Sequence, residues 1–207
     1  MILSAKEKQT LAQVARQLIY FFLTICFALF LWYLAYYYRG ETFTEFGIVE
    51  NIQLVILLAS GWIFVAEAFF LQKDSAILLL LASLCFLGAC REVDSFFDAY
   101  LPVISWKFGY FFPIIAVINL WRQGEKAIKS LFYFFETPAF NLMCAALLIV
   151  VSLAQVLGHR SFIATVLGSE ADARAVRRII EEGAEIIGYF LIFLSTIECY
   201  FNLRSKK

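Results

Sequence analysis

Histidine is nearly absent from this chain, which has a single one, His159, in 207 residues. Zinc hydrolases hold their metal with several histidine and cysteine ligands, so the composition excludes a multi-histidine zinc centre. The Gly-x-Ser-x-Gly turn of many serine hydrolases is also missing. The five cysteines form no Cys-x-x-Cys pair and lie inside or beside apolar runs, which predicts buried thiols rather than a redox site.

Charged residues are scarce as well, at 16% of the chain, and the acidic and basic side chains cancel to a net charge of zero. Soluble domains carry about 25% charged residues. Because the basic residues form no continuous patch, we expect no nucleic-acid partner. What remains is a chain that is 62% hydrophobic, with a mean hydropathy of +0.79. This composition predicts an integral membrane protein of the cell (inner) membrane.

Six apolar stretches approach the length of about 20 residues that crosses a bilayer as a helix. We therefore expect an all-α fold, a single transmembrane bundle over residues 1–207 with no separate soluble domain. The first stretch is too long for a signal peptide and predicts an uncleaved span. Thr137 before Pro138 predicts a capped helix start, and the last helix is expected to begin before the membrane. The predicted spans are Leu18–Tyr38, Ile48–Leu71, Ser75–Tyr100, Pro102–Trp121, Pro138–Leu157 and Arg178–Leu203.

The lysine and arginine residues predict the orientation, because cytoplasmic loops are enriched in them. Six spans place three basic segments on one side: the chain start, the connection between the fourth and fifth spans, and the chain end. Both termini are therefore predicted to be cytoplasmic. The basic residues concerned are Lys6, Lys8, Arg16, Arg122, Lys126, Lys129, Arg204, Lys206 and Lys207.

Polar groups gather at the opposite, extracytoplasmic ends of the predicted spans. A charge at the bilayer centre costs about 2.5–3.5 kcal/mol on insertion scales, so carboxylates there need a partner, a proton or a metal ion. Water and lipid headgroups at the interface reduce this cost. The alternative to a functional site is therefore a set of solvated ion pairs at the helix ends. Glu185 lies deepest of the group. The candidate site residues are Glu50, Gln53, Arg91, Glu92, Asp94, Asp98, His159, Arg178, Glu181, Glu182 and Glu185.

Three functions are compatible with such a charged site. The first is binding or transport of a cation or a lipid headgroup, with a hard divalent cation as the possible cofactor. The second is a scaffold or accessory subunit of a membrane complex, and the third is a metal-assisted or acid/base enzyme acting on a lipid or envelope substrate. Partners besides the bilayer would be other membrane subunits or a second copy in a homo-oligomer. The expected metal ligands are Glu92, Asp94, Glu181 and Glu185.

Two further acids, Glu67 and Glu198, lie toward the cytoplasmic ends of the second and sixth predicted spans. Each is within about two turns of a helix end. We expect both carboxylates to reach the interface along their own side chains; the alternative is that they extend a proton path across the bundle.

Overall fold

The computed structural model describes residues 4–38, 42–43, 47–71, 75–94, 97, 105–167 and 170–204. All regular structure among these residues is helical, which confirms the all-α expectation. Within the described part of the chain, four helices are long and apolar enough to cross a membrane, so the chain is an integral membrane protein. They cover Glu7–Tyr38, Ile48–Phe70, Pro138–Leu157 and Val176–Asn202.

The chain divides into two compact units, residues 1–40 and 41–207. The first unit is a single helix, α1, over Ala5–Tyr38, about 50 Å long at 1.5 Å per residue. It begins well before Leu18, where the apolar run starts. A reciprocal cap explains the early start: Glu7 N donates to Ser4 Oγ at 3.3 Å, and Ser4 N donates to Glu7 Oε2 at 2.7 Å.

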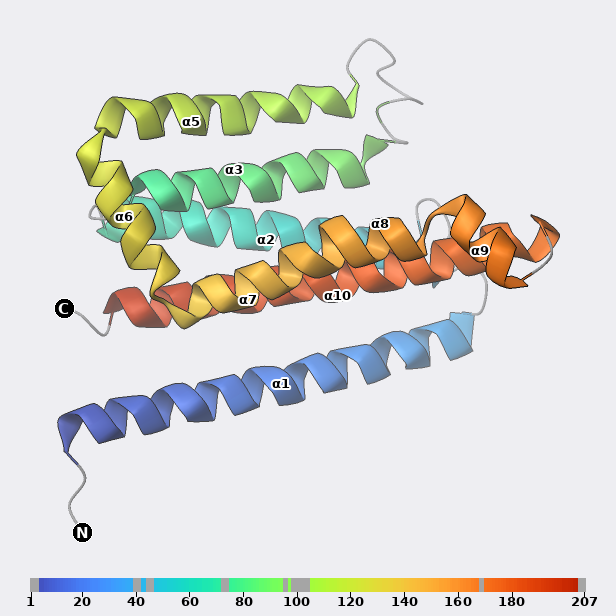
Figure 1. Ribbon diagram of the computed structural model, residues 1–207, viewed down its shortest axis with the longest axis horizontal. Coiled ribbons are helices and arrows are strands. Elements are labelled where there is room, and N and C mark those ends of the chain that lie inside the picture. Colours follow the sequence, from blue (N-terminus) through green and yellow to red (C-terminus); the bar gives the residue numbers. More distant parts are fainter. Residues whose placement is uncertain are drawn as a thin grey trace. The chain divides into compact units, whose positions relative to one another are not determined.

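The second unit is an arc of helices (Figure 1). Along the arc α5 packs on α3, α3 on α2, α2 on α10, and α10 on α7, while α6 crosses one end and contacts α3, α5 and α7. The elements are α2 (Ile48–Leu71), α3 (Ser75–Glu92), the 3-10 helix η2 (Trp106–Tyr110), α5 (Phe111–Gln123), α6 (Glu125–Phe135), α7 (Pro138–Leu147), the π-helical segment η3 (Leu148–Leu153), α8 (Ala154–Leu157), α9 (Arg160–Leu167) and α10 (Glu170–Arg204).

Local chemistry explains several helix boundaries. Pro138 is the first residue of α7, and Thr137 Oγ1 accepts a hydrogen bond from Phe140 N at 3.4 Å, which confirms the predicted cap. Helix α10 begins at Glu170, ahead of its apolar part, as expected. Helix α3 ends at Glu92, and much of the predicted continuation to Tyr100, like the predicted start of the fourth span at Pro102, lies outside the described residues.

A glycine allows α10 to approach the π-helical segment closely. A Cβ atom added at Gly188 would collide with the side chain of Val150 and would lie 3.2 Å from Ala146 O. Small residues permit this kind of close helix packing in membranes. The contact holds η3 against the part of α10 that carries the acidic residues described next.

Candidate functional site

The acidic residues meet at the end of the second unit that lies away from α6. Helix α2 begins there, α3 ends there, and the first half of α10 passes between α2 and α8. The three helices enclose a cavity of about 550 Å³ together with η2 and α8. Its walls contain eight of the eleven predicted site residues. The lining residues are Glu50, Arg91, Glu92, Asp94, Trp106, Gln155, Arg178, Glu181, Glu182 and Glu185.

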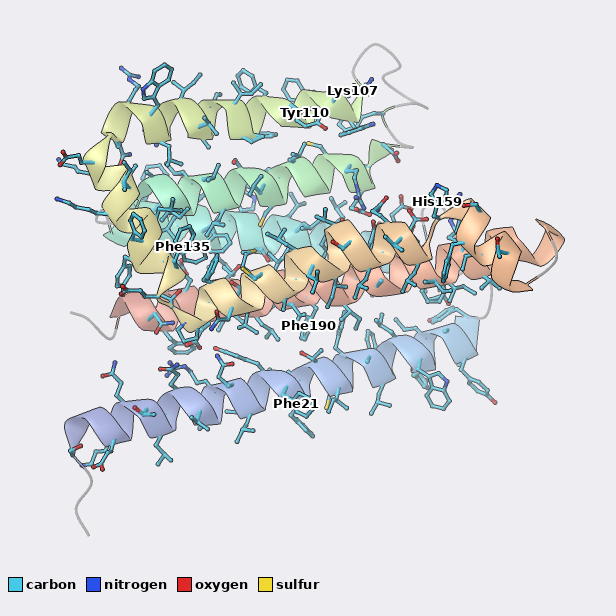
Figure 2. All side chains as sticks on the ribbon, viewed as in Figure 1. Phe21, Lys107, Tyr110, Phe135, His159 and Phe190 are labelled. Carbon is cyan, nitrogen blue, oxygen red and sulfur yellow. The ribbon has the colours of Figure 1, made fainter. Side chains whose placement is uncertain are left out.

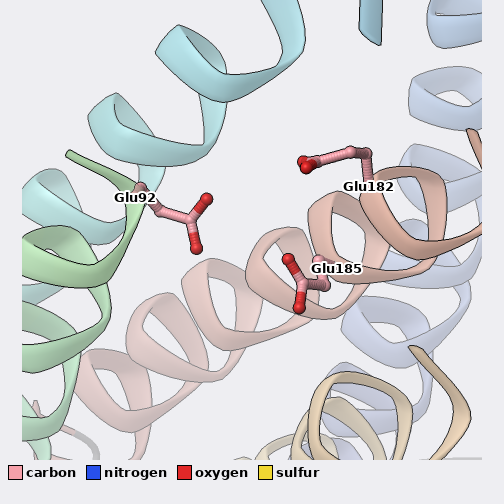
Figure 3. Close-up of side chains that lie close together, drawn as sticks. All are labelled: Glu92, Glu182 and Glu185. Carbon is pink, nitrogen blue, oxygen red and sulfur yellow. The ribbon is translucent and has the colours of Figure 1, made fainter. Parts of the chain in front are cut away.

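Three carboxylates form the centre of this cavity. Glu92 reaches it from α3, and Glu182 and Glu185 reach it from α10 (Figure 3). One oxygen from each of the three lies within 4.8 Å of the others. Glu92 is 8% exposed and Glu185 is 3% exposed, so two of the three charges are largely removed from water. We call these three residues the glutamate triad.

One arginine compensates part of this buried charge. Arg91 Nη2 forms an ion pair with Glu185 Oε1 and lies 3.2 Å from Glu92 Oε1. The Arg91 side chain keeps 38% of its surface exposed, whereas those of Glu92 and Glu185 keep 6% and 4%. The guanidinium group therefore bridges water and two buried carboxylates.

Each member of the triad also accepts a hydrogen bond from a neutral donor on another helix. Tyr189 OH donates to Glu92 Oε1 at 2.7 Å. Gln155 Nε2 donates to Glu185 Oε1 at 3.2 Å, and Gln53 Nε2 donates to Glu182 Oε2 at 3.0 Å. These donors orient the carboxylates and reduce the cost of their burial.

The cavity still carries an excess of negative charge. Among the described residues its walls hold six carboxylates and two guanidinium groups, and Arg177 Nε lies 3.2 Å from Glu181 Oε2, so a formal charge of −3 remains when every carboxylate is ionised. Gln53 is fully buried behind Glu182, and its Oε1 has no hydrogen-bond partner among the described residues. Carboxylate and amide oxygens are the ligands of hard cations, and they also accept hydrogen bonds from ammonium groups. The residues present therefore fit a positively charged ligand.

Two predicted residues, His159 and Gln53, are not among the described residues that line the cavity. His159 lies exposed at the junction of α8 and α9 (Figure 2), with its Nδ1 2.7 Å from Ser161 Oγ. Gln53 acts from behind Glu182, and Asp98 lies outside the described residues. Asp94 and Glu181, which we predicted as metal ligands, line the cavity, but the compact acidic group contains Glu182 in their place.

Sequence reasoning missed three residues of the site. Tyr189 follows Glu185 by four residues, so a helical face drawn from Glu185 would have included it. Gln155 is a polar residue late in the apolar run of the predicted fifth span, and a polar side chain at that position could have identified it as a site residue. Trp106 lines the cavity from η2, and no feature of the sequence distinguishes it from the other aromatic residues.

The two deeper acids do not reach an interface, and our expectation for them is wrong. Glu67 is 3% exposed and Glu198 is fully buried. Asn202 Nδ2 donates to Glu198 Oε1 at 3.1 Å, whereas the hydrogen-bonding neighbour of Glu67 is the thiol of Cys199, a weak donor. Both side chains are packed between helices, so their carboxylates cannot extend along the helix surface to the interface as we had expected.

Comparison with protein families, with curated proteins and with solved structures finds no match for this chain. The geometry of the cavity is therefore the basis for a functional proposal.

Proposed function

We propose that this protein binds a positively charged ligand in the acidic cavity, either a hard divalent cation or the ammonium group of a lipid headgroup. The observation that carries the proposal is the formal charge of −3 that remains around a largely buried glutamate triad once Arg91, Arg178 and Arg177 are counted. Arg91 neutralises one carboxylate of the triad, and a bound cation would neutralise more of the remaining charge. The same site would also serve transport of that ligand.

The proposal includes the arrangement in the membrane. We propose six spans, with α3 as the third span and η2 together with α5 as the fourth, both termini in the cytoplasm, and the cell membrane as the location. Support comes from Arg122, Lys126 and Lys129, which lie at the α6 end of the second unit, away from the acidic cavity. Positive charge marks the cytoplasmic side, so the cavity would open on the extracytoplasmic side.

Cation binding to the purified protein in lipid nanodiscs tests the proposal. The probe is Mn²⁺, followed by electron paramagnetic resonance, with ethanolammonium added as a competitor for the same carboxylates. Glu182→Gln removes one charge from the triad and keeps a side chain of similar shape. We expect it to weaken Mn²⁺ binding about tenfold, equivalent to about 1.4 kcal/mol.

The matched control is Glu125→Gln, which removes the same charge from an exposed position on α6. Its Mn²⁺ affinity should equal that of the unmodified protein. Absence of Mn²⁺ binding, or equal affinity in the two variants, would overturn the proposal. In that case the ion pairs would serve only to fix the packing of the helices, as in a scaffold or accessory subunit.

A further inference from the structure

A second cavity, of about 310 Å³ and mostly apolar, lies next to the acidic one. It occupies the inner side of the arc, where α3 and η2 face α7 and η3 across α2 and α10. Ligand cavities in proteins measure about 300–1,000 Å³, so this one is large enough for part of a small molecule. Its apolar lining suits a hydrocarbon chain rather than an ion.

The two cavities share part of their walls. Arg91 and Trp106 line both of them. Tyr189 lines the apolar cavity, and its hydroxyl group donates a hydrogen bond to Glu92 in the acidic cavity. A strongly charged space therefore adjoins an apolar space across a few side chains. This is the polarity pattern of an amphipathic molecule.

The apolar cavity also reaches the outer surface of the helices. Leu84 on α3, Leu147 on α7 and Val151 on η3 belong to its wall, and they are 43%, 42% and 64% exposed. Such exposed apolar side chains on membrane helices face lipid chains. A chain of a bilayer lipid could therefore enter sideways between α3 and the α7–η3 segment. Segments of π-helix such as η3 occur frequently at functional sites.

We propose that the two cavities together bind one membrane lipid with an ammonium headgroup, such as phosphatidylethanolamine. The ammonium group lies among the glutamate triad and one acyl chain occupies the apolar cavity. This inference rests on the proposed function and names its ligand.

The charges in the cavity favour this class of lipid over others. An ammonium group offers three N–H donors, and the three triad oxygens lie within 4.8 Å of one another. Arg91 and Arg178 are the cations that a phosphate in the same headgroup would meet. A lipid whose headgroup is only anionic would add negative charge to a cavity that already has an excess of it.

Photochemical cross-linking in nanodiscs tests the inference. The probe is phosphatidylethanolamine with a diazirine in one acyl chain, compared with phosphatidylglycerol carrying the same chain. Leu147→Trp places a larger side chain in the wall of the apolar cavity. The control is Leu148→Trp, at the neighbouring and more exposed position outside that wall. We expect Leu147→Trp to lower the cross-linking yield about tenfold. A tenfold loss of affinity corresponds to removing roughly two methylene groups of the acyl chain from the cavity.

Cross-links from phosphatidylethanolamine should map to α3 and the α7–η3 segment and should keep their yield in Leu148→Trp. Phosphatidylglycerol should cross-link about tenfold less, as expected for the loss of one charge-assisted contact. Leu84→Trp fills the same cavity from α3 and provides a second variant if Leu147→Trp does not fold. Each variant is first checked for Mn²⁺ binding, which reports an intact acidic cavity.

Equal cross-linking in Leu147→Trp, Leu84→Trp and Leu148→Trp, or equal cross-linking of the two lipids, would overturn the lipid inference. If Mn²⁺ binding still depends on Glu182 in that case, the proposed cation site stands without it. If Glu182→Gln changes neither Mn²⁺ binding nor the preference for phosphatidylethanolamine, both the proposed function and this inference fail.

Discussion

Arg91 and Glu185 form an ion pair. We expect substitution of Arg91 to lower the free energy of unfolding more than substitution of Glu185. Arg91→Met removes the cation that faces two carboxylates, whose side chains are only 6% and 4% exposed. Removing one partner of a buried pair costs about 3–5 kcal/mol. The lower end of this range applies, because Arg91 is itself 38% exposed and water can partly replace it.

Glu185→Gln should cost less. Arg91 then keeps its contact with Glu92 at 3.2 Å and its access to water, and the amide oxygen at position 185 can still accept a hydrogen bond from Gln155. We expect a loss of about 1–1.5 kcal/mol, the value of one hydrogen bond. The double variant should lose less than the sum of the two, with a coupling energy of about 1–3 kcal/mol.

The assay is reversible unfolding in mixed detergent micelles, followed by circular dichroism, with thermal unfolding as a second measure. A change of 1 kcal/mol shifts the Tm of a chain of this size by about 2–4 °C, so Arg91→Met should lower it by about 6–12 °C. Equal losses in the two single variants, or a coupling energy below about 0.5 kcal/mol, would refute the view that Arg91 compensates two buried carboxylates.

Two further predictions concern positions away from the triad. Glu67→Met should leave stability unchanged or raise it by about 1 kcal/mol, because it removes a buried carboxyl group whose hydrogen-bonding neighbour is the Cys199 thiol, a weak donor. A loss above about 2 kcal/mol in the same unfolding assay would show that this carboxyl group stabilises the fold. Gly188→Ala should destabilise the protein by about 1–3 kcal/mol, because the added Cβ collides with Val150. The same substitution should cost less when Val150→Ala is already present, and an equal cost in both backgrounds would show that the collision with Val150 is not its cause.

The membrane character of the chain could be predicted from local sequence alone. Long apolar runs have few alternatives to a helix in lipid, because each backbone group must find its hydrogen-bond partner within the segment. For that reason α2, α7 and the apolar part of α10 begin or end close to their predicted limits. Helix α3 also begins at Ser75 as predicted, whereas the predicted end of the third span at Tyr100 and the predicted start of the fourth at Pro102 lie outside the described residues.

The convergence of the charges was also within reach of the sequence. Glu50, Arg91 and Glu185 belong to three different apolar runs, but alternating span directions place all three at one end. Because a charge at that depth is costly, each run was expected to bring its polar residues to a common place. The depth of a residue along a helix follows from its position in the run. That position was sufficient to predict the end at which these charges meet.

The tertiary structure alone decided which side chains touch. Rotation of each helix about its axis selects Glu182 rather than Glu181 for the triad, brings Tyr189 to Glu92, and buries Glu67 where we expected it to reach an interface. It also creates the apolar cavity, which depends on α3 and η3 remaining apart on the inner side of the arc. Lipid and protein interiors are equally apolar to a leucine side chain, so hydrophobic periodicity in a membrane helix does not specify its facing partner. Packing against neighbouring helices supplies that information, and the sequence by itself determined the membrane character of the chain and the end at which the charges meet.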